Sequence, residues 1–444
     1  MANTYLERTV GTPDTNGNKK GTFSAWIKRC KIGTEQAMYV TRTSGTQFVR
    51  FRFDADAINV TSNTSGTNYY ATTDAVYRDC NGWYHVVVAY DTTQATAANR
   101  IRIYVNGVEQ SKSASNYPSQ DATIYLLASG QPQRVGAQSS DLYFDGLMSH
   151  VHYTEGYAYA ASDFGSTDSD TGEWKINTSP SVSYGTNGFF WLKDDITTTD
   201  HSPNSNTFTA NGTLTKTLDC PSNVFCTLNA LGNASSNFTL IQGNTYSGGA
   251  DNNWRSIYGT LGASSGKFYY EVKCISSSDY ERFGWCTVDQ MNLYQDSSGR
   301  YDDNDLDEGY GYTSDGEKSN NGGTTGGYGA TWSAGDILSC AIDLDNQKIY
   351  WGKSGTWQNG GDPTSGSTGT GSAYNIEPNK IYVPAFASYG AASNLGFNFG
   401  NGYFRTTEIT TNSGAGYSGA EGKSKFEYQP PTGYSALCTR GLNE

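Results

Sequence analysis

The sequence is poor in charge and has no long apolar run. Only 16% of its 444 residues are charged, 36% are hydrophobic, and nowhere do eighteen apolar residues follow one another. We therefore expect no membrane insertion. Residues 1–10 lack a basic head followed by an apolar stretch, which argues against an export signal and for synthesis in the cytoplasm. With 30 basic against 43 acidic residues, nucleic acid is not expected as a partner, because it binds through side chains that neutralise phosphates.

Cysteine motifs and fibre-forming repeats are also missing. The eight cysteines are scattered through a long chain without a CxxC pair, so we expect reduced thiols rather than a zinc site or a disulfide framework. No heptad or collagen repeat occurs, which disfavours a long trimeric fibre shaft.

Helical periodicity is almost absent, and period-2 alternation replaces it. Alternating runs bounded by Gly, Asn, Asp and Ser occur at 23–27, 83–89 and 101–105, and each indicates a half-buried strand. Asn106-Gly107 directly follows one of them and predicts a tight hairpin turn, since both residues tolerate positive φ. The sequence therefore predicts an all-β protein made of two successive β-sandwich (jelly-roll) domains.

The first half, residues 1–215, carries an ordered series of motifs. They are FSAWIK (23–28), GWYHVV (82–87), RIRIYVNGV (100–108), FDGL (144–147) and SDFG (162–165). The series resembles a laminin-G-like, concanavalin-A-like domain. The stretch from 174 through 188–191 to 208–209 resembles an extension that phage versions of this module carry.

The second half, residues 236–408, resembles a SPRY domain. The matching motifs are KFYYEV (267–272), EGYGY (308–312), GDILSCAIDLD (335–345), KIYW (348–351), VPAF (383–386) and FNFG (397–400). The turn Asp345-Asn346-Gln347 joins two predicted strands at 337–344 and 348–351. Two departures from the family pattern, at 351–355 and in the insertion 359–372, affect loop shape rather than fold.

Two segments outside these halves lack a strand pattern. Residues 216–235 read as a linker, because Pro and Asx residues interrupt alternation there. Residues 409–444 begin Gly/Ser-rich and then pass through Pro430-Pro431, which favours an extended tail that docks on a neighbouring chain.

Catalytic motifs are weak. Gly262 to Gly266 has the GxSxG pattern, but a predicted strand follows it where a nucleophile elbow needs a helix, so we interpret it as a turn. The paired-carboxylate strand Glu-x-Asp-x-x-Glu of related glycoside hydrolases is missing, and the pairs Asp194-Asp195 and Asp302-Asp303 lie in predicted loops. An enzyme is therefore not expected, and a polysaccharide-cleaving activity is only an alternative by fold analogy.

Two groups of residues are of types that can act as metal ligands. Asp303, Asp305 and Asp307 offer closely spaced oxygens of the kind that calcium prefers, although Glu308 stands where an EF-hand loop needs glycine. The alternative is a solvated acidic loop, and no other cofactor is expected. His150 and His152 are two residues apart in a predicted strand, and without a third ligand nearby we expect them on an exposed polar face.

Aromatic residues in predicted loops are the candidate ligand contacts, because sugars stack on exposed Trp and Tyr beside Asn and Asp. These candidates are Trp254, Tyr294, Tyr301, Tyr328, Trp357 and Asn359. Four tryptophans in or beside predicted strands are instead assigned to the core; they are Trp26, Trp83, Trp285 and Trp332.

The two resemblances imply binding of protein or carbohydrate through loops at a sandwich edge. Together with the Asn/Gly/Ser/Thr-rich acidic composition, they suggest a bacteriophage virion surface protein: a tail fibre, head fibre or capsid decoration. Its expected partners are other virion proteins and a host-surface glycan or protein, within a homo-oligomer or larger assembly. A purely architectural virion component is the main alternative.

Overall fold

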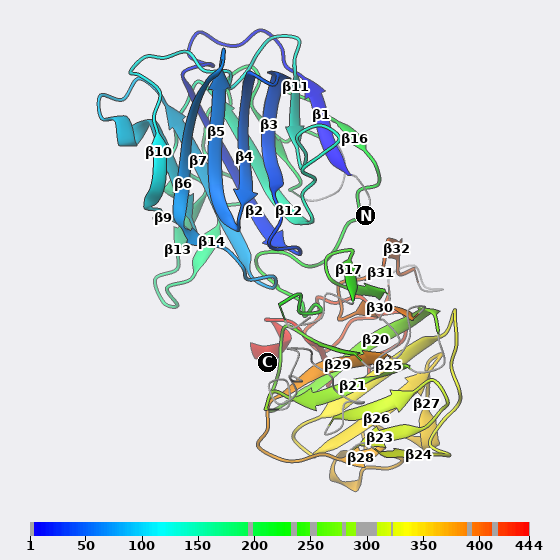
Figure 1. Ribbon diagram of the computed structural model, residues 1–444. Helices are drawn as coiled ribbons and strands as arrows, with labels where there is room; N and C mark the ends of the chain where they lie inside the picture. The colour runs from blue at the N-terminus through cyan, green and yellow to red at the C-terminus, as the bar shows by residue number, and fades with distance from the viewer. Residues whose placement is uncertain are drawn as a thin grey trace. The chain divides into compact units, whose positions relative to one another are not determined.

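The computed structural model describes residues 4–193, 199–231, 238–248, 255–277, 281–289, 309–320, 323–388, 393–410 and 416–443. They form two compact units, Met1–Lys216 and Thr217–Glu444, shown as ribbons in Figure 1. Both consist of β-strands and a few short 3₁₀ helices, which confirms the all-β prediction. No helix among the described residues has the length and hydropathy that a membrane crossing requires.

The first unit contains two large antiparallel sheets. The eight-stranded sheet runs in the order β10 (Lys112–Asn116), β6 (Thr67–Val76), β5 (Ala57–Thr64), β4 (Gln47–Asp54), β3 (Gln36–Ser44), β11 (Pro132–Val135), β1 (Tyr5–Thr9) and β16 (Thr209–Asn211). The six-stranded sheet runs in the order β15 (Phe189–Trp191), β12 (Gly146–Glu155), β2 (Lys20–Arg29), β7 (Trp83–Asp91), β8 (Ile101–Val105) and β9 (Val108–Glu109). The strands β13 (Gly165–Thr167) and β14 (Trp174–Ile176) pair separately.

Apolar side chains from both sheets fill the space between them. Phe51, Ile58 and Val60 of the eight-stranded sheet belong to the same buried cluster as Phe23 and Val88 of the six-stranded one. Trp26 and Trp83 are also buried, as predicted, although they lie outside this cluster. Between β8 and β9, Asn106 and Gly107 both have positive φ (47° and 83°), which confirms the predicted hairpin turn.

The second unit is a further pair of sheets. One contains β17 (Thr239–Ile241), β18 (Tyr246–Gly248), β30 (Asn394–Asn398), β20 (Lys267–Ser276), β25 (Ile337–Asp343), β26 (Lys348–Lys353) and β27 (Thr356–Trp357), with β28 (Tyr374–Asn375) and β33 (Ser435–Ala436) as branches. The other contains β19 (Arg255–Tyr258), β29 (Tyr382–Ser388), β21 (Glu281–Thr287), β22 (Tyr310–Thr313), β23 (Lys318–Asn320) and β24 (Gly323–Thr325). A separate pair is β31 (Tyr403–Phe404) with β32 (Thr407–Glu408).

The predicted turns and core tryptophans of this unit are present. Residues 345–347 connect β25 to β26, and residues 262–266 lead into β20 as a turn. Trp285 and Trp332 lie in the buried cluster. The departure at 351–355 is a two-residue turn, in which Ser354 and Gly355 both have positive φ.

The predicted linker and tail are parts of the second unit. Phe225, Cys226 and Leu228 of the linker segment are buried, so this segment packs into the second core instead of connecting two domains loosely. The tail also packs on its own unit rather than standing out toward a neighbour: β33 pairs in parallel with β20, and Phe225 bridges to Cys438. Burial of apolar side chains at 225–228 and 434–438 stabilises these placements.

Candidate functional site

Three hairpin-connected strands of the first unit present a regular grid of side chains on the outer face of the eight-stranded sheet. Two-residue turns at 45–46, 55–56 and 65–66 fix the register of β3, β4, β5 and β6. In this register, even-numbered residues of β4 and β6 lie opposite odd-numbered residues of β5. Alternate residues of a strand share a face, so these side chains all lie on the same side of the sheet. The rows are Phe48, Asn63 and Asn68; Arg50, Thr61 and Tyr70; and Arg52, Asn59 and Thr72.

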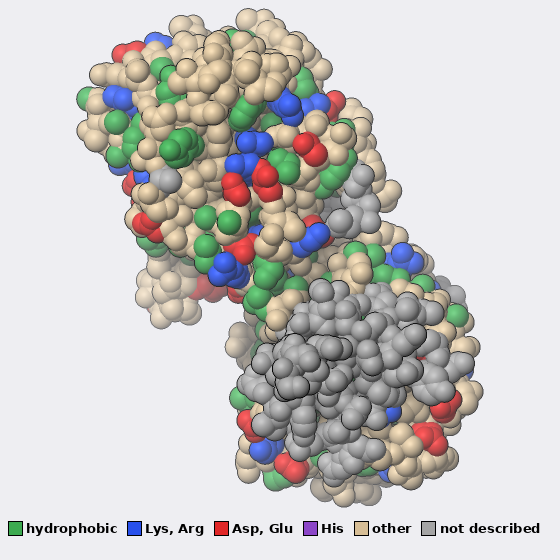
Figure 2. Space-filling model, in the orientation of Figure 1, with side chains coloured by type: hydrophobic (Ala, Val, Ile, Leu, Met, Phe, Trp, Pro, Cys, Tyr) green, Lys and Arg blue, Asp and Glu red, His purple; other side chains and the backbone are tan. Residues whose placement is uncertain are grey.

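This grid is hollowed. A cavity of about 430 Å³ is lined by Gly45 and by eight of the nine grid residues, all except Thr72. Figure 2 views this face of the first unit, where basic and acidic groups lie next to one another in the middle. Asn59 and Asn63 at the floor are buried, whereas Tyr70 at the wall keeps 36% of its surface exposed.

The floor amides are held in place by hydrogen bonds within the sheet. Asn59 donates to Thr72 Oγ1 (2.8 Å), and its Oδ1 accepts from Arg52 Nε (3.0 Å). Asn63 donates to Asn68 Oδ1 (2.7 Å) and accepts from the Gly66 N–H in the hairpin turn (2.9 Å). These bonds preorganise the floor, so a ligand would not have to order it on binding.

Three groups in the hollow retain hydrogen-bonding capacity. Among the described residues, no acceptor or donor partner is found for the Tyr70 hydroxyl, the Asn68 Nδ2 or the Arg50 Nη2. Tyr70 also offers an aromatic face, and Phe48 lies under the Arg50 guanidinium, whose Cζ is 4.9 Å from the ring centroid. An aromatic surface beside unused amide, hydroxyl and guanidinium groups suits a polyhydroxylated ligand.

The two arginines differ in how fully they are neutralised. Arg52 contacts Glu35 and donates from Nη2 to Asp54 Oδ2 (2.8 Å). Arg50 has Glu35 Oε1 at 3.9 Å and otherwise donates to the neutral Gln138 (2.5 Å). Burial lowers the pKa of both guanidinium groups, which both remain charged in proteins.

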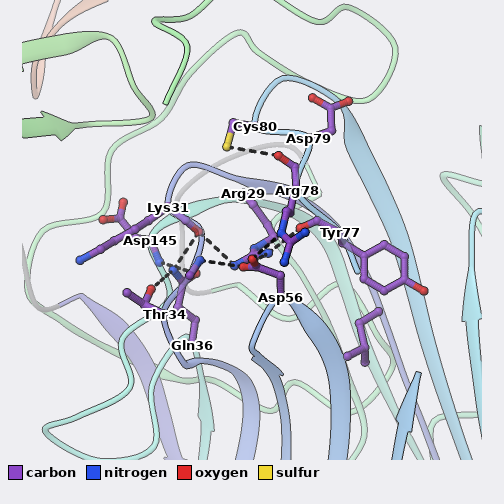
Figure 3. A network of polar contacts seen from close by, with 12 residues as sticks. Arg29, Lys31, Thr34, Gln36, Asp56, Tyr77, Arg78, Asp79, Cys80 and Asp145 are labelled. Atoms are coloured by element: carbon purple, nitrogen blue, oxygen red, sulfur yellow. Dashed lines mark hydrogen bonds and ion pairs between the residues drawn. The ribbon is translucent and has the colours of Figure 1, made fainter. Parts of the chain in front are cut away.

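A second polar cluster, at one end of this sandwich, is centred on a carboxylate that accepts through both of its oxygens (Figure 3). Buried Asp56 accepts from Arg29 (3.0 Å), Arg78 (2.9 Å) and the Gly33 N–H (2.7 Å). Burial alone would raise the pKa of Asp56, but these donors outweigh it and lower the pKa. This carboxylate therefore ties loops together and has no oxygen left for a ligand.

The histidines are not on an exposed face, contrary to the prediction. His150 and His152 are both buried, and a bulge between 149 and 152, with His150 at a φ of 48°, breaks the alternation. His152 stacks on Phe190 (3.9 Å between centroids) and bonds to the Tyr184 hydroxyl (3.0 Å). No cluster of three metal-ligating side chains occurs among the described residues.

Of the aromatics predicted as ligand contacts in loops of the second unit, the structure describes Tyr328 and Trp357. Trp254, Tyr294, Tyr301, the acidic residues Asp303, Asp305 and Asp307, and the pairs at 194–195 and 302–303 lie outside the described residues. Tyr328 was wrongly placed in an exposed loop: it is buried, and its hydroxyl accepts from the Trp351 N–H (3.1 Å). Trp357 is half-buried against Tyr350, and Asn359 is exposed.

The periodicity of single strands did not predict the hollow. Its signal was present: Phe48, Arg50 and Arg52 share one parity of a strand whose other parity is Val49, Phe51 and Phe53. Polar and aromatic residues recur at the matching positions of the next two strands. Reading the three runs as consecutive hairpins would have placed them side by side.

Comparisons with known proteins agree with the two units. Residues 3–156 match the model of the concanavalin A-like lectin/glucanases superfamily, and residues 267–402 match that of the SPRY domain. A concanavalin-A-like domain is therefore followed by a SPRY domain.

Individual relatives are distant and cover the chain in part. The chain is 29% identical over 192 residues to the ATP-dependent RNA helicase Ddx1 of Drosophila melanogaster, spanning 42% of this chain and 20% of that protein. The Xenopus laevis DDX1 is 30% identical over 103 residues, 23% of this chain and 12% of that protein. The chain thus spans a fifth or less of these relatives.

Solved structures with similar folds include the SPRY domain of human HERC1, at 12% identity and a TM-score of 0.27, covering 34% of this chain and 87% of that one. A putative carbohydrate binding protein from Bacteroides ovatus is 16% identical with a TM-score of 0.31, covering 48% of this chain and 56% of that one.

Proposed function

We propose that this protein is a non-enzymatic binding protein that holds a glycan in the hollow on the outer face of β4, β5 and β6. The observation that carries the proposal is Tyr70, whose exposed ring and unbonded hydroxyl stand beside Asn68 over a floor of hydrogen-bonded amides. Sugar rings stack on aromatic faces while their hydroxyls bond to amides. The concanavalin-A-like domain supports carbohydrate as the ligand class.

We further propose that the protein is carried on the surface of a bacteriophage particle and that its ligand belongs to the host surface. Support comes from the acidic composition rich in Gly and polar residues and from the pairing of two recognition modules. In this role, the SPRY domain contacts other virion proteins. A glycan-binding first unit and a protein-binding second unit divide attachment and anchoring between them.

The proposal is tested by retention of the purified protein on a panel of immobilised bacterial surface polysaccharides, with the eluate assayed for cleaved sugar. We expect retention on at least one polysaccharide without cleavage. Replacing Tyr70 with Ala should weaken binding about tenfold, the loss that a ring-stacking contact of about 1.4 kcal/mol gives. Tyr157→Ala is the matched control, because Tyr157 is an exposed tyrosine of the same unit that does not line the hollow.

Three other outcomes of this experiment would favour a different function or a different binding site. Absence of retention on every polysaccharide would favour a purely architectural virion component. Release of shortened sugar would favour a polysaccharide-cleaving enzyme. Retention that survives Tyr70→Ala unchanged would place the binding site outside the hollow.

A further inference from the structure

The Arg50 guanidinium lies in the middle row of the hollow with its charge incompletely balanced. Only 16% of the side chain is exposed, its Nη1 donates to the neutral Gln138, and the nearest carboxylate oxygen, on Glu35, is 3.9 Å away. That same Glu35 oxygen makes a closer contact with Arg52. The carboxylate is therefore committed mainly to the neighbouring arginine.

A second basic group adds to this charge. Arg42 of β3 lies opposite Phe48 in the register, and its Nε donates to the Ser44 carbonyl (3.3 Å) rather than to an acid. Burial and then the positive charge of Arg42 lower the pKa of Arg50, while the charges of Asp54 and Asp141 act in the opposite direction. This end of the hollow therefore mixes basic and acidic side chains, and Arg50 is less closely paired than Arg52.

A partly buried cation without a close counter-ion favours binding of an anion, because the anion restores the interaction lost with water. Both the Nη2 and the buried Nε of Arg50 remain without an acceptor among the described residues, and Nη2 is the one offered to a ligand here. Phe48 stacks beneath this guanidinium and fixes its plane. Tyr70 stands in the same row of the grid, across Thr61.

We infer that the hollow selects acidic glycans, in which a carboxylate-bearing sugar places its charged group against Arg50 Nη2 while a neighbouring sugar ring stacks on Tyr70. This inference rests on the proposed function and specifies its ligand class. In contrast, Arg52 is a positioning residue: its guanidinium is taken up by Glu35, Asp54 and Asn59, and it shapes the floor.

The test compares acidic polysaccharides with the same chains after chemical reduction of their carboxyl groups, which keeps the backbone and removes the charge. Immobilised alginate, polygalacturonate and polysialic acid serve as probes in both forms, beside neutral dextran. We expect stronger binding of the acidic chains, with affinity falling about tenfold or more after reduction. Affinity for the acidic form should also fall as salt rises from 50 to 500 mM, because salt screens the charge pair.

Variants assign the effect to one side chain. The Arg50→Gln variant should bind acidic chains about tenfold more weakly than the unaltered protein does. Its affinity for reduced chains should be unchanged. Arg102→Gln is the control, because Arg102 is an exposed arginine of β8 paired with Glu109 outside the hollow. If Arg50→Gln does not fold, the salt dependence of the unaltered protein still tests the inference. An affinity for acidic chains that does not fall with salt would contradict it.

The possible failures are distinct. Equal binding of acidic and reduced chains, abolished by Tyr70→Ala, would overturn the selectivity and leave the proposed function standing. Equal loss of affinity in Arg50→Gln and Arg102→Gln would overturn the role of Arg50. Absence of binding to all probes and to the wider polysaccharide panel would overturn both proposals.

Discussion

The indole N–H of Trp174 donates a hydrogen bond of 2.9 Å to Nδ1 of His85. Because Nδ1 accepts, the proton of neutral His85 is on Nε2, which lies 2.9 Å from Ser24 Oγ. The His85 ring is also stacked between Trp26 and Trp174, with centroids 5.0 and 5.9 Å away. This stack joins the segment around β14 to the outer face of the six-stranded sheet.

The first prediction concerns acid sensitivity of the first unit. Burial, and then the charge of His150, lowers the pKa of His85 to about 3, against about 6.5 in an unfolded chain. Below pH 6.5 the unfolded state binds the proton and the folded state does not, so stability is lost as pH falls. Between pH 7 and 4.5 the contribution of His85 should fall by about 3 kcal/mol.

Hydrogen exchange of peptides from β2 and β7 in the full chain measures this loss. His85→Gln is the comparison variant, because its amide can keep both bonds without titrating. The difference in exchange protection of these peptides between the unaltered protein and His85→Gln should become smaller in acid, because only the protein with His85 loses stability there. A difference that does not change with pH would contradict the prediction.

The second prediction concerns the opposite pH response of the second unit. Buried Glu271 accepts from the N–H groups of Glu427 (2.9 Å) and Tyr428 (2.8 Å), from Asn398 and from the Tyr269 hydroxyl. Burial outweighs these bonds and raises its pKa to about 7. The folded state therefore keeps a proton that the unfolded state releases above about pH 4.3, and stability falls as pH rises through this window, by roughly 3 kcal/mol.

Protection of the segment 426–436 against hydrogen exchange should accordingly decrease between pH 4.5 and 7.5. The decrease should remain after correction for the intrinsic exchange rate, which itself rises with pH. In Glu271→Gln the dependence should vanish and the segment should exchange faster at every pH, because the new amide NH₂ faces groups that are themselves donors. Unchanged protection of 426–436 in this variant would show that Glu271 does not hold the tail.

A third prediction concerns the buried ion pair of Arg29 and Asp56. Arg29 is 0% exposed, so Asp56→Ala leaves its charge without the carboxylate and should destabilise the first unit by about 3–5 kcal/mol. Arg78→Ala removes the exposed partner of the same carboxylate and should cost about 1 kcal/mol or less. Urea denaturation of the three proteins compares these values, and equal losses would contradict the assigned roles.

Much of the fold followed from local pattern. Period-2 alternation located strands such as β2, β7 and β25, and Asn106-Gly107 located a turn, because both signals depend only on neighbouring residues. The tail was misjudged because its placement depends on partners far along the chain: Phe426 packs on Tyr269, and Tyr434 bonds to the Pro363 carbonyl.

The site was harder to predict for the same reason. The loop position of Tyr328 suggested exposure, but its ring fills space between Tyr312 and Trp351 in the core. His152 faces away from the core cluster that holds Val151 and Tyr153, but Phe164, Phe190 and Tyr184 cover it. The hollow needs the register of three adjacent strands, which single-strand periodicity does not supply.

The most direct test of the account is a crystal structure of the protein soaked with a short fragment of a polysaccharide that it retains. The account predicts sugar rings in the hollow over β4, β5 and β6, with one ring on Tyr70 and an acidic group at Arg50. A fragment bound instead beside Trp357 and Asn359 in the second unit, with the hollow empty, would contradict it.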